Sequence, residues 1–563
     1  MSGSIGTTSS GSVFIGGTSS GINTTALIDA AVAQKTRRAD TLQVEIDGNV
    51  SKIGAYDELT TLTSAIDSAL DRLRGPESPF DDTERVFDLK AGTVLTSDGS
   101  DFSSIVDIAI DSDAIPGTYE IEVLEAAKSQ RVGSNNIVDD TAALGYAGTF
   151  DLGLLGGGSA NISITAGQSL QDVRDTINAQ TDTTGVEASI LKVSETEYQL
   201  ILSGTQTAQD LETFATSGDD VLNLLGVSDG FGGFSNTLQP ASGALIKFDG
   251  VEVRRDDNNF DDLIDGIDLD VKNAAPGTII SLEVDNDVVS VKEAIEDFIA
   301  AYNAFRDFVI LNQQVDSAGN TAEGAELFSD SLLNGLTDQY SNILALNFGN
   351  GGDIQTIRDL GITIGNGNKL EISDPARLDS ALLNNFDEVK TAFASGAETD
   401  NDAFRLTGNT STASSQSIVF DLTTDGAGTI TGVTANGDGA AFTINGSTIV
   451  GAAGSGFEGL TFTYVGTDTN VTINADLTQG LADKIINGTN PYTDNVTGLI
   501  IREKANLQSE NQDKTQDVLD IRTRAEDFRQ AQIERYAKLE ADSARLNVLL
   551  DQIRAILGNN DDD

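Results

Sequence analysis

Residues 26–56 read ALIDAAVAQKTRRADTLQVEIDGNVSKIGAY. A mostly apolar series of residues recurs in this stretch at alternating intervals of four and three positions. This is the heptad spacing of a helix that packs along one side against a partner helix. Two polar residues, Lys35 and Asn49, fall into the series. Each is either a seam residue that lowers stability while restricting the register, or a solvent-exposed residue on the flank of a broken helix. The apolar members of the series are Ile28, Val32, Ala39, Leu42, Ile46, Ile53 and Tyr56.

The helical pattern extends on both sides of this stretch. Asn23 or Thr24 is a usable cap at its start, and Gly75-Pro76 stops it. Gly48 and Gly54 are weak points inside the pattern. Residues 22–74 therefore predict one long helix, roughly 80 Å if unbroken at 1.5 Å per residue, or two core helices joined near a glycine.

Residues 499–557 carry a second long apolar stripe of helical periodicity at the other end of the chain. Because each end presents an apolar seam that only a partner helix can bury, we expect the two ends to pack together. The predicted fold is therefore a multidomain α+β fold, with long coiled-coil-like helices at both termini and β-rich outer domains inserted between them. The residues expected to form the helix seam and assembly face are Ile22, Leu27, Ile28, Val32, Leu42, Ile46, Ile53, Tyr56, Leu539, Leu546, Leu549 and Ile553.

Between the ends, the pattern alternates between strands and further helices. Tyr119, Ile121 and Val123 alternate as in a strand, and Ser169 caps a short helix inside a β-α-β-β unit. The expected segments are a disordered N-terminus (1–21), an N-terminal helical leg (22–79), a mixed β segment (80–150), a small β-α-β-β module (151–243), a β segment (244–289), a helical and mixed core domain (290–404), an all-β insert (405–476), a C-terminal helical leg (477–557) and an acidic tail (558–563).

The composition excludes several classes of function. The 563 residues contain no Cys and no His, which removes disulfides, thiolate nucleophiles, His-based metal sites and the Ser-His-Asp triad. The net charge of −54, from 88 acidic and 34 basic residues, repels nucleic acid and anionic membranes. No stretch reaches the length of about 18 apolar residues that a membrane helix needs. We expect no cofactor, no nucleic-acid partner and no membrane insertion.

Residues 1–21 are rich in Ser, Gly and Thr and lack the charged and apolar regions of a Sec signal. A Cys-free, acidic chain rich in Gly, Thr and Asp is nevertheless typical of proteins displayed outside the cell. An unusual export route would reconcile the two observations.

Several short motifs, in a fixed order, resemble one known family. The sequence resembles the flagellar filament cap family, FliD, also called hook-associated protein 2, over nearly the whole chain except residues 405–476. The module at 166–178 is similar to one shared by flagellins and hook-associated proteins. The motifs are GGTSSGIN (16–23), PGTYEIEV (116–123), AAKSQ (126–130), AGQSLQDVRDTIN (166–178), FDGVEV (248–253), LIDGIDL (263–269), FIAAYN (298–303) and LGITI (360–364).

The resemblance implies a structural role. Members of this family form a small homo-oligomeric ring at the distal tip of the flagellar filament, with helical legs that reach into the filament end. It implies flagellin and the filament end as partners, together with the flagellar type III export apparatus and a cytoplasmic export chaperone. Export as an unfolded chain agrees with the absence of Cys, since a disulfide would block passage through a narrow channel. Adhesion to surfaces is compatible with capping.

Two alternatives stay open at this point, and a third, an enzyme, is not expected. A hook–filament junction protein or a flagellin-like axial protein shares the paired helical ends, although helices at 290–395 lie deeper in the chain than in flagellin-like proteins. A secreted β-rich adhesin predicts a cleaved signal or an anchor. An enzyme predicts a site, but among 88 acids carboxylate pairs arise by chance, and acid-rich turns such as Asp256-Asp257 are more often solvated than catalytic.

Overall fold

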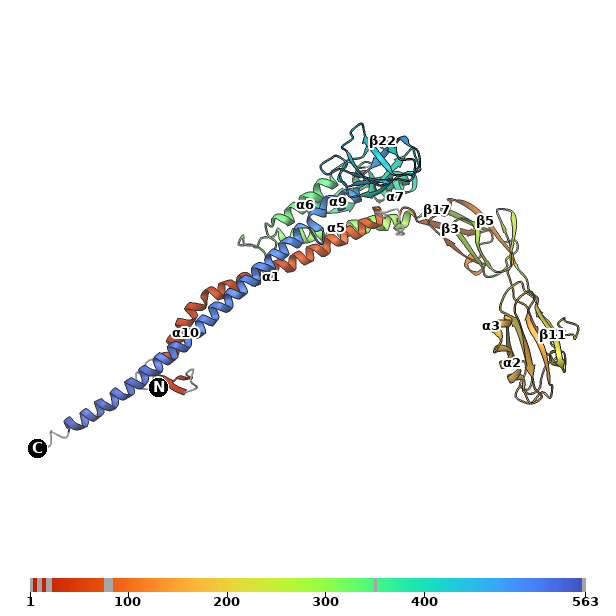
Figure 1. The fold of residues 1–563 in the computed structure, drawn as a ribbon, viewed down its shortest axis with the longest axis horizontal. Coiled ribbons are helices and arrows are strands. Elements are labelled where there is room, and N and C mark those ends of the chain that lie inside the picture. Colours follow the sequence, from red (N-terminus) through yellow and green to blue (C-terminus); the bar gives the residue numbers. More distant parts are fainter. Residues whose placement is uncertain (1–3, 8–12, 17–22, 75–84, 349–351, 559–563) are drawn as a thin grey trace. The chain divides into compact units, whose positions relative to one another are not determined.

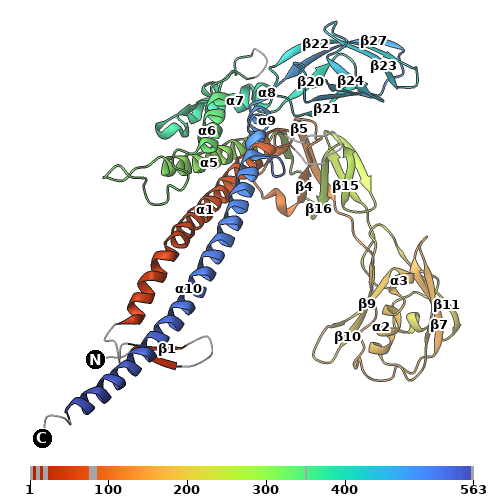
Figure 2. The same ribbon diagram turned by 60° about the vertical axis from the view of Figure 1, so that its left-hand side comes forward.

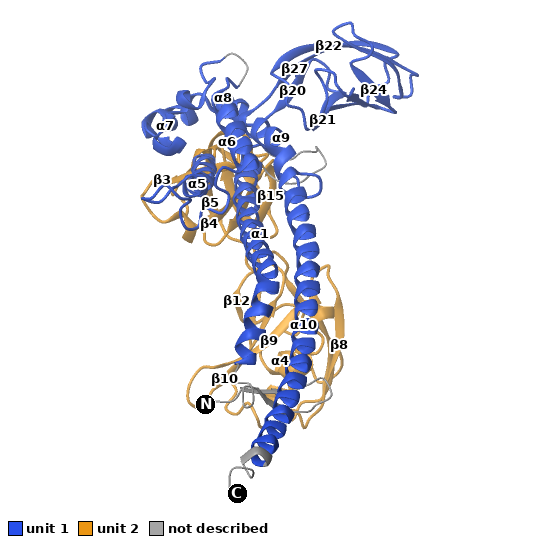
Figure 3. Cartoon of the chain, turned by 90° about the vertical axis from the view of Figure 1, so that its left-hand side faces the viewer, with its two compact units in different colours: residues 1–83, 291–563 blue, residues 84–290 orange. Residues whose placement is uncertain are grey.

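The computed structural model describes residues 4–7, 13–16, 23–74, 85–348 and 352–558. The chain forms two compact units, one of residues 1–83 and 291–563 and the other of residues 84–290 (Figure 3). No helix in the described ranges is long and apolar enough to span a membrane. The same ranges contain no group of three or more acidic side chains placed to hold a metal ion.

Two long helices dominate the first unit. Helix α1 (Thr24–Arg74) lies beside α10 (Leu499–Gly558) along most of its length (Figures 1 and 2). The Asn23 side chain accepts a hydrogen bond of 3.1 Å from the Ala26 N–H, which caps the start of α1. Gly48 and Gly54 lie inside α1 without breaking it, so of the two expected alternatives the structure has the single long helix. The two helices pack as the heptad pattern requires.

The N-terminal segment contains secondary structure that its composition does not predict. Strands β1 (Ser4–Thr7) and β2 (Val13–Gly16) pair antiparallel, with Ile5 opposite Ile15. The expectation that residues 1–21 are disordered throughout is therefore wrong for these eight positions. The short runs of β-branched and aromatic residues, such as Val13–Ile15, favour extended pairing over the surrounding Ser and Gly.

A group of shorter helices packs around the C-terminal end of α1. Its centre holds Tyr302, Phe305 and Tyr340, with the Phe305 and Tyr340 ring centroids 4.9 Å apart. A strand pair, β18 (Ile362–Ile364) with β19 (Leu370–Ile372), completes this body. The helices are α5 (Val288–Asn312), α6 (Ser331–Leu344), α7 (Pro375–Asn384), α8 (Phe386–Phe393) and α9 (Leu481–Thr493).

Two four-stranded sheets of the same unit form a sandwich between α8 and α9. Phe404 and Phe462 stack in its core with ring centroids 5.0 Å apart. One sheet has the order β20 (Gly396–Thr399), β27 (Asn470–Thr478), β22 (Gln416–Thr424) and β23 (Ile430–Ala435). The other has the order β21 (Phe404–Asn409), β26 (Leu460–Tyr464), β25 (Thr448–Gly451) and β24 (Phe442–Asn445).

Both ends of the sandwich meet at one point. Gly396, at the start of β20, pairs with Thr478, at the end of β27, so the first and last residues of the sandwich are neighbours. The Ser395 hydroxyl accepts a 2.9 Å hydrogen bond from the Gly480 N–H and lies 3.2 Å from the Gln479 side-chain oxygen, to which it donates. The sandwich therefore starts at Gly396, whereas the sequence pattern places its start at 405.

The second unit contains a β-sandwich and a smaller module. Strands from 90–125 and 244–286 share one sheet, in which Val123 of β5 pairs with Ile246 of β13. Segments that the sequence treats separately thus share one core. The five-stranded sheet has the order β14 (Val251–Arg255), β13 (Ala244–Phe248), β5 (Gly117–Glu125), β17 (Ile280–Asn286) and β3 (Lys90–Thr96), and the three-stranded sheet has the order β15 (Asn259–Ile264), β16 (Ile267–Val271) and β4 (Val106–Ile110).

The smaller module lies between β5 and β13 in the sequence. Ser169 caps its main helix in a reciprocal capping box, since its hydroxyl accepts from the Asp172 N–H and the Asp172 carboxylate accepts from the Ser169 N–H. The predicted cap is confirmed. The elements are β6 (Arg131–Gly133), β7 (Gly148–Leu154), β8 (Ser159–Ile164), α2 (Leu170–Asn178), α3 (Thr181–Thr184), β9 (Val186–Lys192), β10 (Tyr198–Gly204), β11 (Leu211–Gly218), α4 (Val221–Leu224) and β12 (Thr237–Gln239).

Candidate assembly interface

The seam between α1 and α10 is apolar near the start of α1. Ile28 and Val32 are buried against Ala525, and Phe528 and Ile533 pack around them. Burial of an aliphatic side chain of this kind contributes about 1.5–3 kcal/mol. The helix pair is therefore held by side chains that neither helix could bury alone.

Ion pairs across the seam fix the alignment of the two helices. Asp29 pairs with Arg529 at 2.8 Å and Glu45 with Lys514 at 2.6 Å. Asp57 pairs with Lys504 further along. Partner numbers on α10 fall as those on α1 rise, which is the signature of antiparallel packing. Each exposed pair contributes only about 0.2–1 kcal/mol, but together they favour one register.

The two polar residues of the heptad series have different surroundings. Asn49 is half-buried, and its side-chain amide donates a 3.0 Å hydrogen bond to the Asn511 side chain on α10. Lys35 is exposed, and its Nζ lies 4.5 Å from the centroid of the Phe528 ring. Asn49 is therefore a seam residue that pairs across the interface, whereas Lys35 lies on the flank and covers an aromatic side chain.

Most N-terminal seam residues lie where the heptad pattern places them. Ile28, Val32 and Tyr56 are buried. Leu42, Ile46 and Ile53 are half-buried, as expected for residues on the border of a two-helix seam. Leu27 is an exception because its side chain is 50% exposed. Ile22 lies outside the described residues.

The four C-terminal residues do not lie in the α1–α10 seam. Helix α10 continues past the start of α1, as Figures 1 and 3 show, so no turn of α1 faces them. Their exposed fractions are 46% for Leu539, 60% for Leu546, 52% for Leu549 and 49% for Ile553. Val548 and Leu550 beside them are also exposed. We call residues 537–555 the α10 overhang. Strand β2 contacts α10, and Glu540 in this range is buried, but the described residues leave the apolar side chains named above exposed.

At its other end, α1 is anchored in the helical body by polar contacts that sequence reasoning missed. The Tyr56 hydroxyl donates a 2.7 Å hydrogen bond to Asp330, the residue that caps α6. Arg74 lies 3.0 Å from Asp71 and 3.5 Å from Asp483 of α9, and both Arg74 and Asp483 side chains are 8% exposed. Contacts between residues hundreds of positions apart leave no local pattern, so only a basic residue in the last turn of α1 hinted at this site.

Asp67 is the most perturbed acid of this joint. Burial, and then the neighbouring negative charge of Asp71, raise the pKa of its carboxyl to about 7 from the usual 3.8, against the lowering effect of Arg74. Its Oδ1 is buried and has no hydrogen-bond partner among the described residues. Burial is also the main cause that raises the pKa of Tyr340, followed by the charge of Asp67. The joint therefore contains a carboxyl that gives up its proton only near neutral pH.

Family models match most of the chain. The model of the flagellar hook-associated protein 2 C-terminus matches residues 241–547, more than half of the chain. The model of the N-terminus of the same family matches residues 20–130, which include α1. The flagellin hook IN motif matches residues 150–206, the core of the small module.

Curated relatives agree with these matches. The flagellar hook-associated protein 2 of Aeromonas caviae is 26% identical over 389 residues, which cover 67% of this chain and 80% of the relative. The A-type flagellar hook-associated protein 2 of Pseudomonas aeruginosa is 25% identical over 403 residues, covering 68% of this chain and 80% of the relative.

Among solved structures, the D1-D2-D3 domains of the flagellar cap protein FliD from Escherichia coli are 22% identical with a TM-score of 0.44, covering 60% of this chain and 88% of that one. The family models confirm the resemblance of the short motifs. The packing of α1 against α10, with β-rich domains between them in the sequence, confirms the expected fold. The chain belongs to the flagellar hook-associated protein 2 (FliD) family.

Proposed function

We propose that this chain caps the distal tip of a bacterial flagellar filament and promotes the folding and insertion of exported flagellin subunits. The observation that carries the proposal is the α10 overhang, whose apolar residues stay exposed at heptad-like spacing. An exposed apolar surface of this kind marks an interaction site on a soluble protein. Within a cap, the filament end is the surface that would cover it.

The cap is a homo-oligomeric ring in this proposal. The α1–α10 pair forms the leg of each subunit, and its ion pairs and the Asn49–Asn511 contact support a leg that is already ordered before docking. The β-rich domains, inserted between the two leg helices in sequence, supply the plate of the ring. The expected seam residues then divide into two groups, those that hold the leg together and those that meet the filament.

The chain reaches the outside of the cell, in this proposal, through the flagellar type III export apparatus, accompanied by a cytoplasmic chaperone. A chain without Cys suits transport in the unfolded state. The role is structural rather than enzymatic, and adhesion to surfaces can accompany it. No cofactor and no nucleic-acid partner are needed.

A junction protein between hook and filament is the second candidate. It would use the same paired terminal helices, and the hook IN motif at 150–206 is compatible with any axial component of the flagellum. The matches to both ends of the hook-associated protein 2 family favour the cap.

Immunogold electron microscopy of the native organism, with antibody against this chain, tests the proposal directly. Gold confined to filament tips is the expected result. Gold at the hook–filament junction, along the filament or on the cell body would instead identify a junction protein, a flagellin or an adhesin, and each of these outcomes would overturn the cap.

A further inference from the structure

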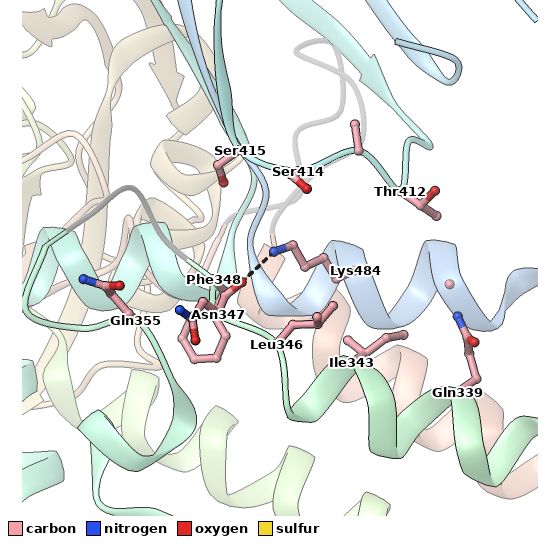
Figure 4. A pocket seen from close by; sticks show the side chains of 12 residues that line it. Gln339, Ile343, Leu346, Asn347, Phe348, Gln355, Thr412, Ser414, Ser415 and Lys484 are labelled. Atoms are coloured by element: carbon pink, nitrogen blue, oxygen red, sulfur yellow. Dashed lines mark hydrogen bonds between the residues drawn. The ribbon is translucent and has the colours of Figure 1, made fainter. Parts of the chain in front are cut away.

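A pocket of about 400 Å³ lies where the helical body meets the segment that leads into β22 (Figure 4). Its floor is apolar and consists of Ile343, Leu346 and Phe348. Its opposite wall is the stretch 412–415, which carries the hydroxyls of Ser414 and Ser415. A volume of this size matches the lower end of the range for small-molecule sites.

One charged side chain lines this pocket. Lys484 extends from α9 between the floor and the wall in Figure 4, and its ammonium donates a 3.0 Å hydrogen bond to the carbonyl oxygen of Asn347. Among the residues that the structure describes, no carboxylate forms an ion pair with it. This is unusual in a chain with 88 acidic and 34 basic residues, where a lysine has many possible partners.

The surroundings of Lys484 make an anionic ligand favourable. The side chain is half-buried, and burial lowers the pKa of its ammonium group. Lys484 is also the only basic residue between Arg405 and Arg502 in the sequence. A partly desolvated ammonium with a single neutral acceptor gains a charge-assisted hydrogen bond when a carboxylate arrives.

We propose that this pocket binds a short aliphatic monocarboxylate, with the carboxylate on the Lys484 ammonium and the hydrocarbon chain on Ile343, Leu346 and Phe348. The ligand must be amphiphilic because the charge and the apolar floor lie within one cavity. A cation would meet the ammonium, and a neutral alcohol would leave it without a counter-charge. The proposal does not depend on the capping function.

Hexanoate is a suitable probe because it combines one carboxylate with a hydrocarbon chain that fits the floor. Calorimetric titration of the full-length protein at low ionic strength should give a dissociation constant on the order of millimolar, as expected for a ligand of this size. Hexanol and hexylammonium, which have the same chain, should bind at least about tenfold more weakly. Equal affinity for hexanoate and hexanol would overturn the proposal.

Two variants separate the contributions of charge and cavity. Lys484→Met should weaken hexanoate about tenfold or more, while Lys128→Met, which removes an exposed lysine of the other unit, should leave the affinity unchanged. Ala413→Phe keeps the lysine but fills the cavity from the exposed wall, so it should abolish binding even if Lys484→Met proves unstable. Full hexanoate affinity in either of the two pocket variants would contradict the assignment.

Discussion

The side-chain amide of Asn49 on α1 donates a 3.0 Å hydrogen bond to the side chain of Asn511 on α10, across 462 positions of sequence. A polar pair inside an otherwise apolar helix seam costs stability but disfavours every alignment in which the two groups do not meet. The pair therefore selects one register from the several that a heptad pattern permits.

Replacing both partners tests this role. The double variant Asn49→Leu/Asn511→Leu should raise the free energy of unfolding by about 1–2 kcal/mol and loosen the register at the same time. The natural chain has no Cys, so engineered cysteines report the register cleanly. A short bismaleimide should link Glu45→Cys to Lys514→Cys in the parent chain but not to Ile521→Cys, one heptad away. Linking of both pairs is expected only in the double-leucine variant, and unchanged selectivity there would refute register selection.

Ile46 offers a test of the seam as a whole. Ile46→Asp places a charge at a half-buried position facing α10 and should destabilise the helix pair by about 2–3 kcal/mol. Val44→Asp is a matched control on the same helix, because the Val44 side chain is 71% exposed. Thermal unfolding followed by circular dichroism measures both. Equal effects of the two substitutions would mean that the stripe is not the packing surface.

Substitutions in the α10 overhang should impair docking at the filament tip without destabilising the fold. Leu546→Asp and Leu549→Asp change side chains that are more than half exposed, so the melting temperature of the isolated protein should hardly move. Docking at the filament tip, followed by motility and by immunogold labelling, should be lost because a charge would then face the apolar surface of the filament end. Gln552→Asp adds the same charge at an exposed polar position and serves as the control. Normal motility in the two leucine variants would remove the overhang from the docking site.

Asp67 predicts a specific dependence of stability on pH. Its folded-state pKa of about 7 is above the usual 3.8, so the folded state holds the proton more tightly than the unfolded chain does. Stability is therefore greatest with the carboxyl protonated, falls as the pH rises from about 4 to about 7, and stays low above that range. The chain has no His or Cys, so few other groups obscure this transition near neutral pH.

Asp67→Asn should remove this pH dependence and stabilise the protein by about 1–3 kcal/mol at pH 8, because the buried carboxylate is charged at that pH whereas the amide is neutral. Urea unfolding at pH 5 and pH 8 measures the effect. Asp40→Asn, at an exposed position of the same helix, should leave the pH profile unchanged. If the stability of Asp67→Asn depended on pH as that of the parent protein does, another titrating group would be the cause of the dependence.

The net charge predicts how salt acts on the whole molecule. With −54 charges, repulsion within the chain opposes the compact state. Raising NaCl from about 0.1 to 1 M shortens the screening length from about 10 to 3 Å and should raise the melting temperature. A melting temperature that falls over this range would show that the interhelical ion pairs outweigh the repulsion.

The sequence predicts local features well because their causes are local. The heptads of α1, the cap at Ser169 and the periodicity of β5 can each be read within a few turns or residues. Long-range contacts cannot be read in this way, since they depend on the path of the intervening chain. Examples are the pairing of Val123 with Ile246 and the contact of Arg74 with Asp483. The sequence also could not predict that Leu546 is exposed, because the same apolar spacing occurs in a helix with a partner helix and in a helix without one.

The meeting of Gly396 and Thr478 at the base of the first unit's sandwich makes that domain separable from the leg. Because the chain enters and leaves at neighbouring positions, the segment between them can be shortened to a turn or exchanged for a foreign domain without moving α8 or α9. A foreign domain whose two ends lie equally close together could be joined to the protein at the same two positions.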